Sequence, residues 1–211
     1  MRKINILTVL ILLSSIIVVG LVMALPDIVP VHININGDVD RYGSKWFVLL
    51  GSIIAFFAAA LIQIYLRKTK NKSPEALQIM MTIILAVLIG VCWLPYIITT
   101  KTGLNNIQVI MGIFFSGMLI FMGNYMGLLK MNKVAGIRVK WTFADEEIWQ
   151  KTHRLGGYVM VIAGVILLIV TLTAFLFRVD LIFISLLILS LISVLIPVLY
   201  SYQLYKRKYN S

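Results

Sequence analysis

Six long stretches without a charged residue or a histidine restrict the folds that this sequence can adopt. Each stretch exceeds twenty residues, and about 20 helical residues cross a bilayer core of about 30 Å because each residue rises about 1.5 Å. Continuous apolar runs favour helices over barrel strands, in which apolar and polar residues alternate. We therefore predict six transmembrane helices, at residues 4–25, 46–66, 76–98, 107–129, 155–177 and 181–205.

The composition excludes a water-soluble globule. Of the 211 residues, 61% are hydrophobic and 13% are charged, and the charged share is about half that of a soluble domain. The predicted fold class is an all-α integral membrane protein, in which residues 1–211 form a single membrane domain with six helices in one bundle.

The first apolar stretch starts like a signal peptide, because Arg2 and Lys3 precede it. Its apolar part is longer than the usual signal core of about 7 to 15 residues. It has the length of a full membrane span, so we expect a retained anchor.

The distribution of basic residues predicts the orientation, since cytoplasmic loops are enriched in Lys and Arg. With a cytoplasmic N-terminus, the inner segments hold 15 of the 19 basic residues and the outer loops hold 4. The acidic residues divide equally, so the net charge of +11 lies on the inner face. We predict that both termini are cytoplasmic, and that the basic balance reflects topology and attraction to anionic lipid, with no direct nucleic-acid binding.

Two connections between the predicted helices are long. The outer loop covers residues 26–45 and the inner loop covers residues 130–154, whereas the other connections are short. Loops of this length in a compact protein usually carry function. These two loops are therefore the candidate functional segments.

Both loops contain patterns that resemble a known family. The outer loop has an L-P-x-x-V-P-x-H start and a G-x-x-D-x-x-x-S-K end, formed by Leu25, Pro26, Pro30, His32, Gly37, Asp40, Ser44 and Lys45. The inner pattern consists of Gly123, Asn124, Asn132, Gly136, Ile137, Arg138, Trp141, Thr142, Trp149, Thr152, His153 and Arg154. Together they resemble the SdpI-type immunity proteins.

The resemblance implies a multi-pass protein of the bacterial cell membrane that protects the producing cell against a secreted peptide toxin. It also implies a signal to a cytoplasmic repressor. The expected toxin-facing residues of the outer loop are Pro26, Pro30, His32, Gly37, Asp40, Ser44 and Lys45. The expected partner-docking residues of the inner loop are Asn132, Gly136, Arg138, Trp141, Trp149, His153 and Arg154.

The residue types suggest local structure in the outer loop. Pro26 and Pro30 fix φ and remove donors, so we expect an extended chain after the first helix. Asp40 is expected to form a surface ion pair with Lys45 or Arg41. The alternating Asn and Asp residues lack the pattern of a calcium loop, so a solvated turn is preferred over a metal site.

The inner loop is expected to contain a short capped helix. Thr142 and Asp145 mark its start, and Glu147 and Lys151 have the favourable i, i+4 order. Trp141 and Trp149 indicate an apolar side that lies along the membrane interface. Arg138 has three open interpretations, as a ligand of lipid phosphate, of a partner's carboxylate or of a neighbouring helix end.

Small residues in the fourth and fifth predicted helices indicate close packing. Gly123 and Gly127 form a GxxxG pair, and Gly156, Gly157 and Gly164 line the start of the fifth helix. Such residues let helix backbones approach one another. Packing within one chain is the preferred interpretation, with homo-oligomer formation as the alternative.

The sequence argues against an enzyme. His32 and His153 lie on opposite predicted faces and cannot share a metal or a proton, and the single Cys92 cannot form an internal disulfide or a metal cluster. No cofactor is predicted. The alternative function is a small polytopic transporter or exporter of a neutral solute or peptide, although the predicted spans hold no ionisable ion-binding residue.

Overall fold

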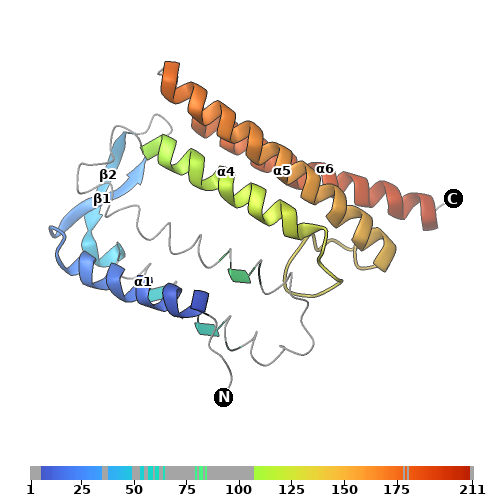
Figure 1. The fold of residues 1–211 in the computed structure, drawn as a ribbon, viewed down its shortest axis with the longest axis horizontal. Helices are drawn as coiled ribbons and strands as arrows, with labels where there is room; N and C mark the ends of the chain where they lie inside the picture. Colours follow the sequence, from blue (N-terminus) through green and yellow to red (C-terminus); the bar gives the residue numbers. More distant parts are fainter. Residues whose placement is uncertain are drawn as a thin grey trace. The chain divides into compact units, whose positions relative to one another are not determined.

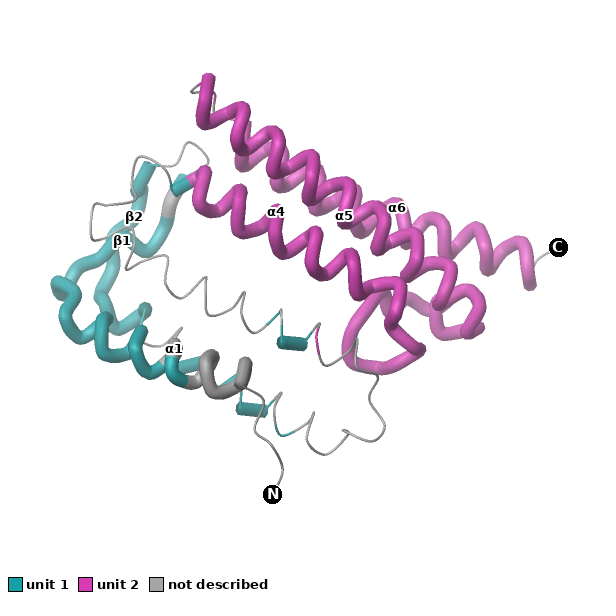
Figure 2. The backbone as a smooth tube through the Cα atoms, in the orientation of Figure 1, with its two compact units in different colours: residues 1–73, 81–107 teal, residues 74–80, 108–211 magenta. Residues whose placement is uncertain are grey.

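The computed structural model describes residues 6–34, 38–48, 107–177, 179 and 181–209, together with scattered residues between 53 and 84. The described chain is mostly helical, and it forms two compact units, which Figure 2 distinguishes by colour. The predicted helices at 46–66 and 76–98 lie largely outside the described residues, as do Cys92 and Gly37.

The first unit contains helix α1 (Ile6–Met23), which coincides with the first predicted span, and the strands β1 (Ile28–Ile33) and β2 (Val39–Ser44). The two strands form an antiparallel hairpin in which Ile28 faces Ser44 and Val29 faces Gly43. The register shifts on both sides of His32. The all-α prediction omits these two strands, whereas the extended chain expected after the first helix is confirmed at Ile28–Ile33, where β-branched residues around Pro30 favour it.

A small apolar core joins the hairpin to α1. Five buried residues form it, contributed by the helix, by the turn after it, by β1 and by the helical residues that follow β2. They are Val18, Val22, Leu25, Val29 and Val48. The hairpin is thus fixed to the end of α1 by burial of one face.

In the second unit, the described residues include three long helices that run side by side in Figure 1. They are α4 (Ile107–Met126), α5 (Glu146–Phe177) and α6 (Ile182–Tyr209). All three are long and apolar enough to cross a membrane. The chain is a multi-pass membrane protein.

Helix α5 differs from the sequence prediction at its start. It begins at Glu146 and continues without a break to Phe177, so the separate short helix expected in the inner loop is wrong. No Pro or other breaker separates the polar first turns from the apolar run that starts at Leu155. The polar turns are an extension of the fifth predicted span.

Glycines determine how closely α4 and α5 approach. A Cβ added to Gly123 would lie 2.7 Å from the carbonyl oxygen of Gly157, and one added to Gly164 would lie 2.9 Å from that of Ser116. Neither position accepts a side chain unless the helices move apart. The prediction of close packing within one chain is confirmed at these glycines.

Candidate functional site

The α4–α5 loop (residues 127–145) closes on itself through short-range hydrogen bonds. The Asn132 side-chain oxygen accepts from the backbone N–H groups of Val134 and Ala135, both at 2.8 Å, and its amide nitrogen donates to the Lys130 carbonyl at 2.9 Å. Gly136 follows with a φ of 113°, which disfavours any residue with a side chain. Asn132 and Gly136 therefore shape the turn.

His153 connects the loop to α5 and has no exposed surface. Its Nδ1 lies 2.8 Å from the Trp149 carbonyl oxygen and its Nε2 lies 2.9 Å from the Ile137 backbone nitrogen. Since a carbonyl only accepts and a backbone N–H only donates, Nδ1 carries the proton and Nε2 accepts. The ring is neutral, and burial lowers its pKa although the hydrogen bond to Trp149 opposes this.

Trp149 covers one face of the His153 ring. The two rings stack with centroids 4.0 Å apart and planes inclined by 20°. The indole N–H donates to the Leu129 carbonyl at 2.7 Å, and the whole residue is buried. Trp149 thus ties the first turns of α5 to the chain that leaves α4.

Thr142 has a different role from the one predicted, whereas Asp145 marks the start of the helix as expected. The buried Thr142 hydroxyl lies 2.8 Å from the Ile137 carbonyl oxygen and accepts from the Val139 N–H at 3.1 Å, so it closes the loop. Asp145 caps α5, because its carboxylate accepts from the N–H groups of Glu147 and Ile148 at 2.7 and 3.3 Å. The expected Glu147–Lys151 pair forms, at 2.7 Å.

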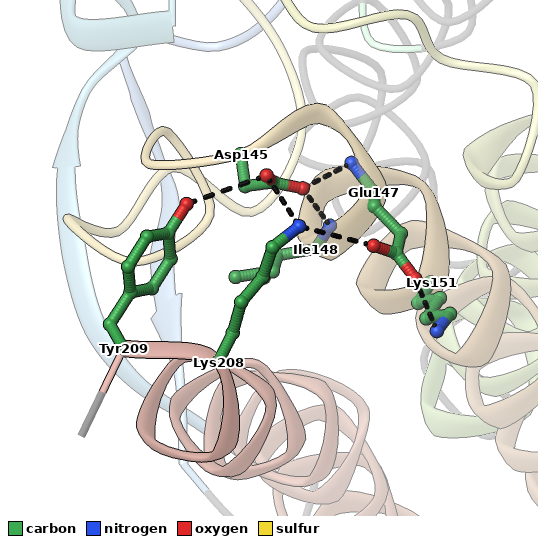
Figure 3. Close-up of polar contacts among 6 residues, drawn as sticks. All are labelled: Asp145, Glu147, Ile148, Lys151, Lys208 and Tyr209. Atoms are coloured by element: carbon green, nitrogen blue, oxygen red, sulfur yellow. Dashed lines mark hydrogen bonds and ion pairs between the residues drawn. The ribbon is translucent and has the colours of Figure 1, made fainter. Parts of the chain in front are cut away.

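The end of α6 reaches the start of α5. Figure 3 shows the Lys208 ammonium between two carboxylates, 2.8 Å from Asp145 and 3.2 Å from Glu147. The hydrogen bond from Lys208 lowers the pKa of Asp145. Hydrogen bonds from Lys151 and, to a smaller extent, from Lys208 lower the pKa of Glu147. In turn, the Asp145 and Glu147 carboxylates raise the pKa of Lys208. The Tyr209 hydroxyl lies 3.4 Å from Asp145.

The predicted docking residues divide into buried and exposed sets. Trp149 and His153 are buried, whereas Arg138 and Arg154 are exposed. Trp141 is half-buried, and its ring meets that of Tyr202 edge to face at 5.3 Å. Its indole N–H is buried and has no hydrogen-bond partner among the described residues. The docking role of the set stays a prediction.

The hairpin carries a different arrangement of the predicted outer residues. His32 Nδ1 lies 2.5 Å from the Asp40 carboxylate across the two strands. The expected pairing of Asp40 with Lys45 or Arg41 is wrong, because Lys45 folds back to Asp27 at 3.1 Å and to the Leu25 carbonyl at 3.0 Å. The outer pattern thus contains two separate polar contacts.

The remaining outer residues have structural positions. Pro26 is exposed and Pro30 is buried within β1. The Ser44 hydroxyl accepts from the Trp46 backbone N–H at 3.4 Å. Their toxin-facing role stays a prediction.

Sequence reasoning missed the contact between α6 and α5. Lys208 and Asp145 are 63 residues apart, and no local pattern links them. In the part of the chain that the structure describes, no three His, Cys or acidic side chains gather in a way that could hold a metal ion.

Two family models match separate parts of the chain. Residues 129–201 match the SdpI/YfhL protein family, and residues 9–61 match a domain of unknown function, DUF1648. The chain is 32% identical over 102 residues to the immunity protein SdpI of Bacillus subtilis (strain 168). This alignment covers 48% of the chain and 47% of the relative, so it spans about half of each.

No solved structure matches the chain. The SdpI/YfhL match begins at Leu129, whose carbonyl accepts from Trp149, and includes the whole network around His153. The resemblance seen in the sequence is thereby confirmed, since residues 129–201 match the SdpI/YfhL family.

Proposed function

We propose that this chain is a membrane immunity protein, which protects the cell that produces it against a secreted peptide toxin. The similarity to the immunity protein of Bacillus subtilis carries the proposal. The α4–α5 loop supports it, because the matched segment is folded into a specific hydrogen-bonded structure at the end of helices of membrane length.

We propose that the protein crosses the membrane six times and that both termini lie in the cytoplasm. The bias of basic residues supports this topology. Single cysteines at Asp38 and at Lys133, each in a Cys92→Ser background, test it. An impermeant thiol reagent is expected to label the Asp38 variant in intact cells and the Lys133 variant only after permeabilisation, and the reverse labelling would contradict the topology.

Protection is tested by expression in a Bacillus subtilis strain that lacks its own SdpI. Culture supernatants of the strain that naturally carries this chain, and of Bacillus subtilis, supply the killing peptides. Higher survival than in cells with an empty vector is expected with at least one supernatant. Unchanged survival with both, at normal membrane abundance, would contradict immunity.

The hairpin is the proposed toxin-facing surface. His32 and Asp40 are about half exposed and form one polar feature on it. Changing His32, Asp40 and Lys45 together to Ala is expected to lower survival without lowering abundance. A variant with Asp38 and Arg41 changed to Ala is the matched control, because both are exposed on the same hairpin.

The α4–α5 loop is the proposed signalling surface toward a cytoplasmic repressor. A toxin bound on one side of the membrane influences a partner on the other side only if both bind more tightly to the same one of two conformations of the protein. The close α4–α5 contact at Gly123 and Gly157 is the proposed two-state element. Arg154→Ala is expected to weaken recruitment of the repressor to membranes while immunity remains, and loss of both together would contradict a separate signalling surface.

A further inference from the structure

Charged residues are segregated within the α4–α5 loop and the first turns of α5. Residues 130–140 contain four basic residues and no acidic one. The acidic residues follow together at 145–147, where Asp145 and Glu147 are already bound by Lys208. Glu146 forms no ion pair with a basic residue of this segment, so among the described residues the basic part of the loop has no paired counter-charge.

The basic side chains point to solvent. Five exposed residues form this set, which we name the basic turn: Lys130, Lys133, Arg138, Lys140 and Arg154. Among the described residues none of them has an ion-pair partner. Arg154 belongs to the set because its Cα would lie only 3.4 Å from a Cβ on Gly127, which places it beside the start of the loop.

Arg138 is held in place by the loop itself. One guanidinium nitrogen donates to the Lys133 carbonyl at 2.7 Å. This contact uses a neutral acceptor, so it leaves the full positive charge and further donors available. A guanidinium binds phosphate oxygens through two parallel hydrogen bonds, and a side chain that is already ordered loses less entropy on binding.

The basic turn follows the ends of two membrane-length helices, where phospholipid headgroups are expected. Helix α4 ends at Met126, and the apolar part of α5 starts at Leu155, so both membrane-length helices end beside the loop (Figure 1). Leu128 is 62% exposed and Phe143 is 40% exposed on either side of it. Apolar side chains that flank exposed cations fit the boundary between headgroups and acyl chains.

We propose that the basic turn binds the phosphate of an anionic phospholipid in the adjoining leaflet, with Arg138 and Lys133 as the central ligands. The positive charge without a counter-ion selects an anionic headgroup over a zwitterionic one. This proposal does not depend on the immunity function, because it concerns the resting protein without toxin.

Lipid retention by the purified full chain tests the proposal. The protein in detergent is mixed with phosphatidylglycerol or with phosphatidylcholine, and native mass spectrometry counts the bound lipid. We expect wild type to retain phosphatidylglycerol in preference to phosphatidylcholine. The Lys133→Gln/Arg138→Gln variant is expected to bind it roughly 25-fold more weakly, about fivefold for each lost cation.

An Arg41→Gln/Lys206→Gln variant is the matched control, since it removes two exposed cations from other segments. It is expected to bind within about twofold of wild type, because it leaves the basic turn intact. Arg138→Lys is expected to bind the lipid more strongly than Lys133→Gln/Arg138→Gln and more weakly than wild type, because the charge remains and the planar guanidinium does not. An equal loss in both double variants would overturn the proposal, as would the absence of any headgroup preference.

Two further measurements separate the remaining explanations. Inorganic phosphate is expected not to displace the lipid, and displacement at equal concentration would show a site for free phosphate and overturn the lipid assignment. If Lys133→Gln/Arg138→Gln alters the tryptophan fluorescence and so the fold, Lys130→Gln/Lys140→Gln tests the same surface, because the structure shows no hydrogen bond from either side chain. Normal retention in that folded variant would also overturn the proposal.

Discussion

The α4–α5 loop and the hairpin both connect helices. Buried side chains anchor the loop, whereas the polar contacts on the hairpin are largely exposed. Trp149 and His153, in the first turns of α5 against the loop, have no exposed surface, and each of their ring nitrogens has a partner. On the hairpin, the His32 and Asp40 side chains are 53% and 43% exposed. Removal of a buried partner leaves an unsatisfied group or a cavity, whereas an exposed pair is replaced by water.

This difference predicts where stability and recognition are located. Changes in the loop network should act on folding, and changes in the exposed hairpin pair should act on contact with another molecule.

Trp149→Ala should destabilise the second unit by about 3–5 kcal/mol, because it leaves a large cavity and frees the buried Leu129 carbonyl. Thermal unfolding in detergent, followed by circular dichroism, measures the loss. Phe143→Ala is the matched control, since Phe143 touches the same indole but is 40% exposed. Equal losses in the two variants would contradict a buried anchor at Trp149.

Gly157→Ala should destabilise the α4–α5 packing by about 1–3 kcal/mol, because a Cβ there would lie 2.6 Å from the Gly123 carbonyl oxygen. Gly117→Ala in α4 is the control, since a Cβ at Gly117 meets nothing within 4 Å. The control should be neutral or slightly stabilising. The same unfolding measurement checks both, and a neutral Gly157→Ala would show that the helices separate easily.

The stability of the loop should decrease as the pH falls. Burial lowers the pKa of His153 below its ordinary value of 6.5, so the folded state binds a proton less readily than the unfolded state. The stabilising contribution of neutral His153 is complete above 6.5 and is lost progressively below it. Protonated Nε2 could no longer accept from the Ile137 N–H.

Unfolding midpoints between about pH 7.5 and about pH 5.5 check this prediction. His153→Gln should be less stable at high pH but should show a flatter dependence, and a His32→Gln background removes the other histidine. The carboxylates of Asp145 and Glu147, whose pKa values are lowered from 3.8 and 4.5, titrate below this window. An unchanged slope in His153→Gln would assign the pH dependence to another group.

The smallest effect on stability is expected at the hairpin. Asp40→Asn removes the charge that faces His32 across the strands, and an exposed pair contributes about 0–1 kcal/mol. The unfolding midpoint should hardly change, whereas survival under toxin should fall if the hairpin contacts the toxin. A large loss of stability would place the hairpin pair in the same structural class as the loop network.

Patterns close in sequence predicted much of the structure. The uncharged runs predicted α4 and most of α5 and α6, because the length of an apolar run and the thickness of a bilayer are independent of tertiary contacts. The glycines predicted close helix packing, since a missing side chain has few other uses at regular helical spacing. The Glu147–Lys151 pair also followed from spacing within one helix.

Contacts between distant residues were decided by the tertiary structure alone. Asp40 pairs with His32 and not with Lys45, because the bulged register of the hairpin determines which side chains face each other. Asp145 pairs with Lys208 because the end of α6 lies beside the start of α5. His153 became a buried neutral ring because Gly136, in a conformation with positive φ, lets the loop pass directly over it. Residue type predicts which bonds a side chain is able to form, and only the path of the chain determines the partner.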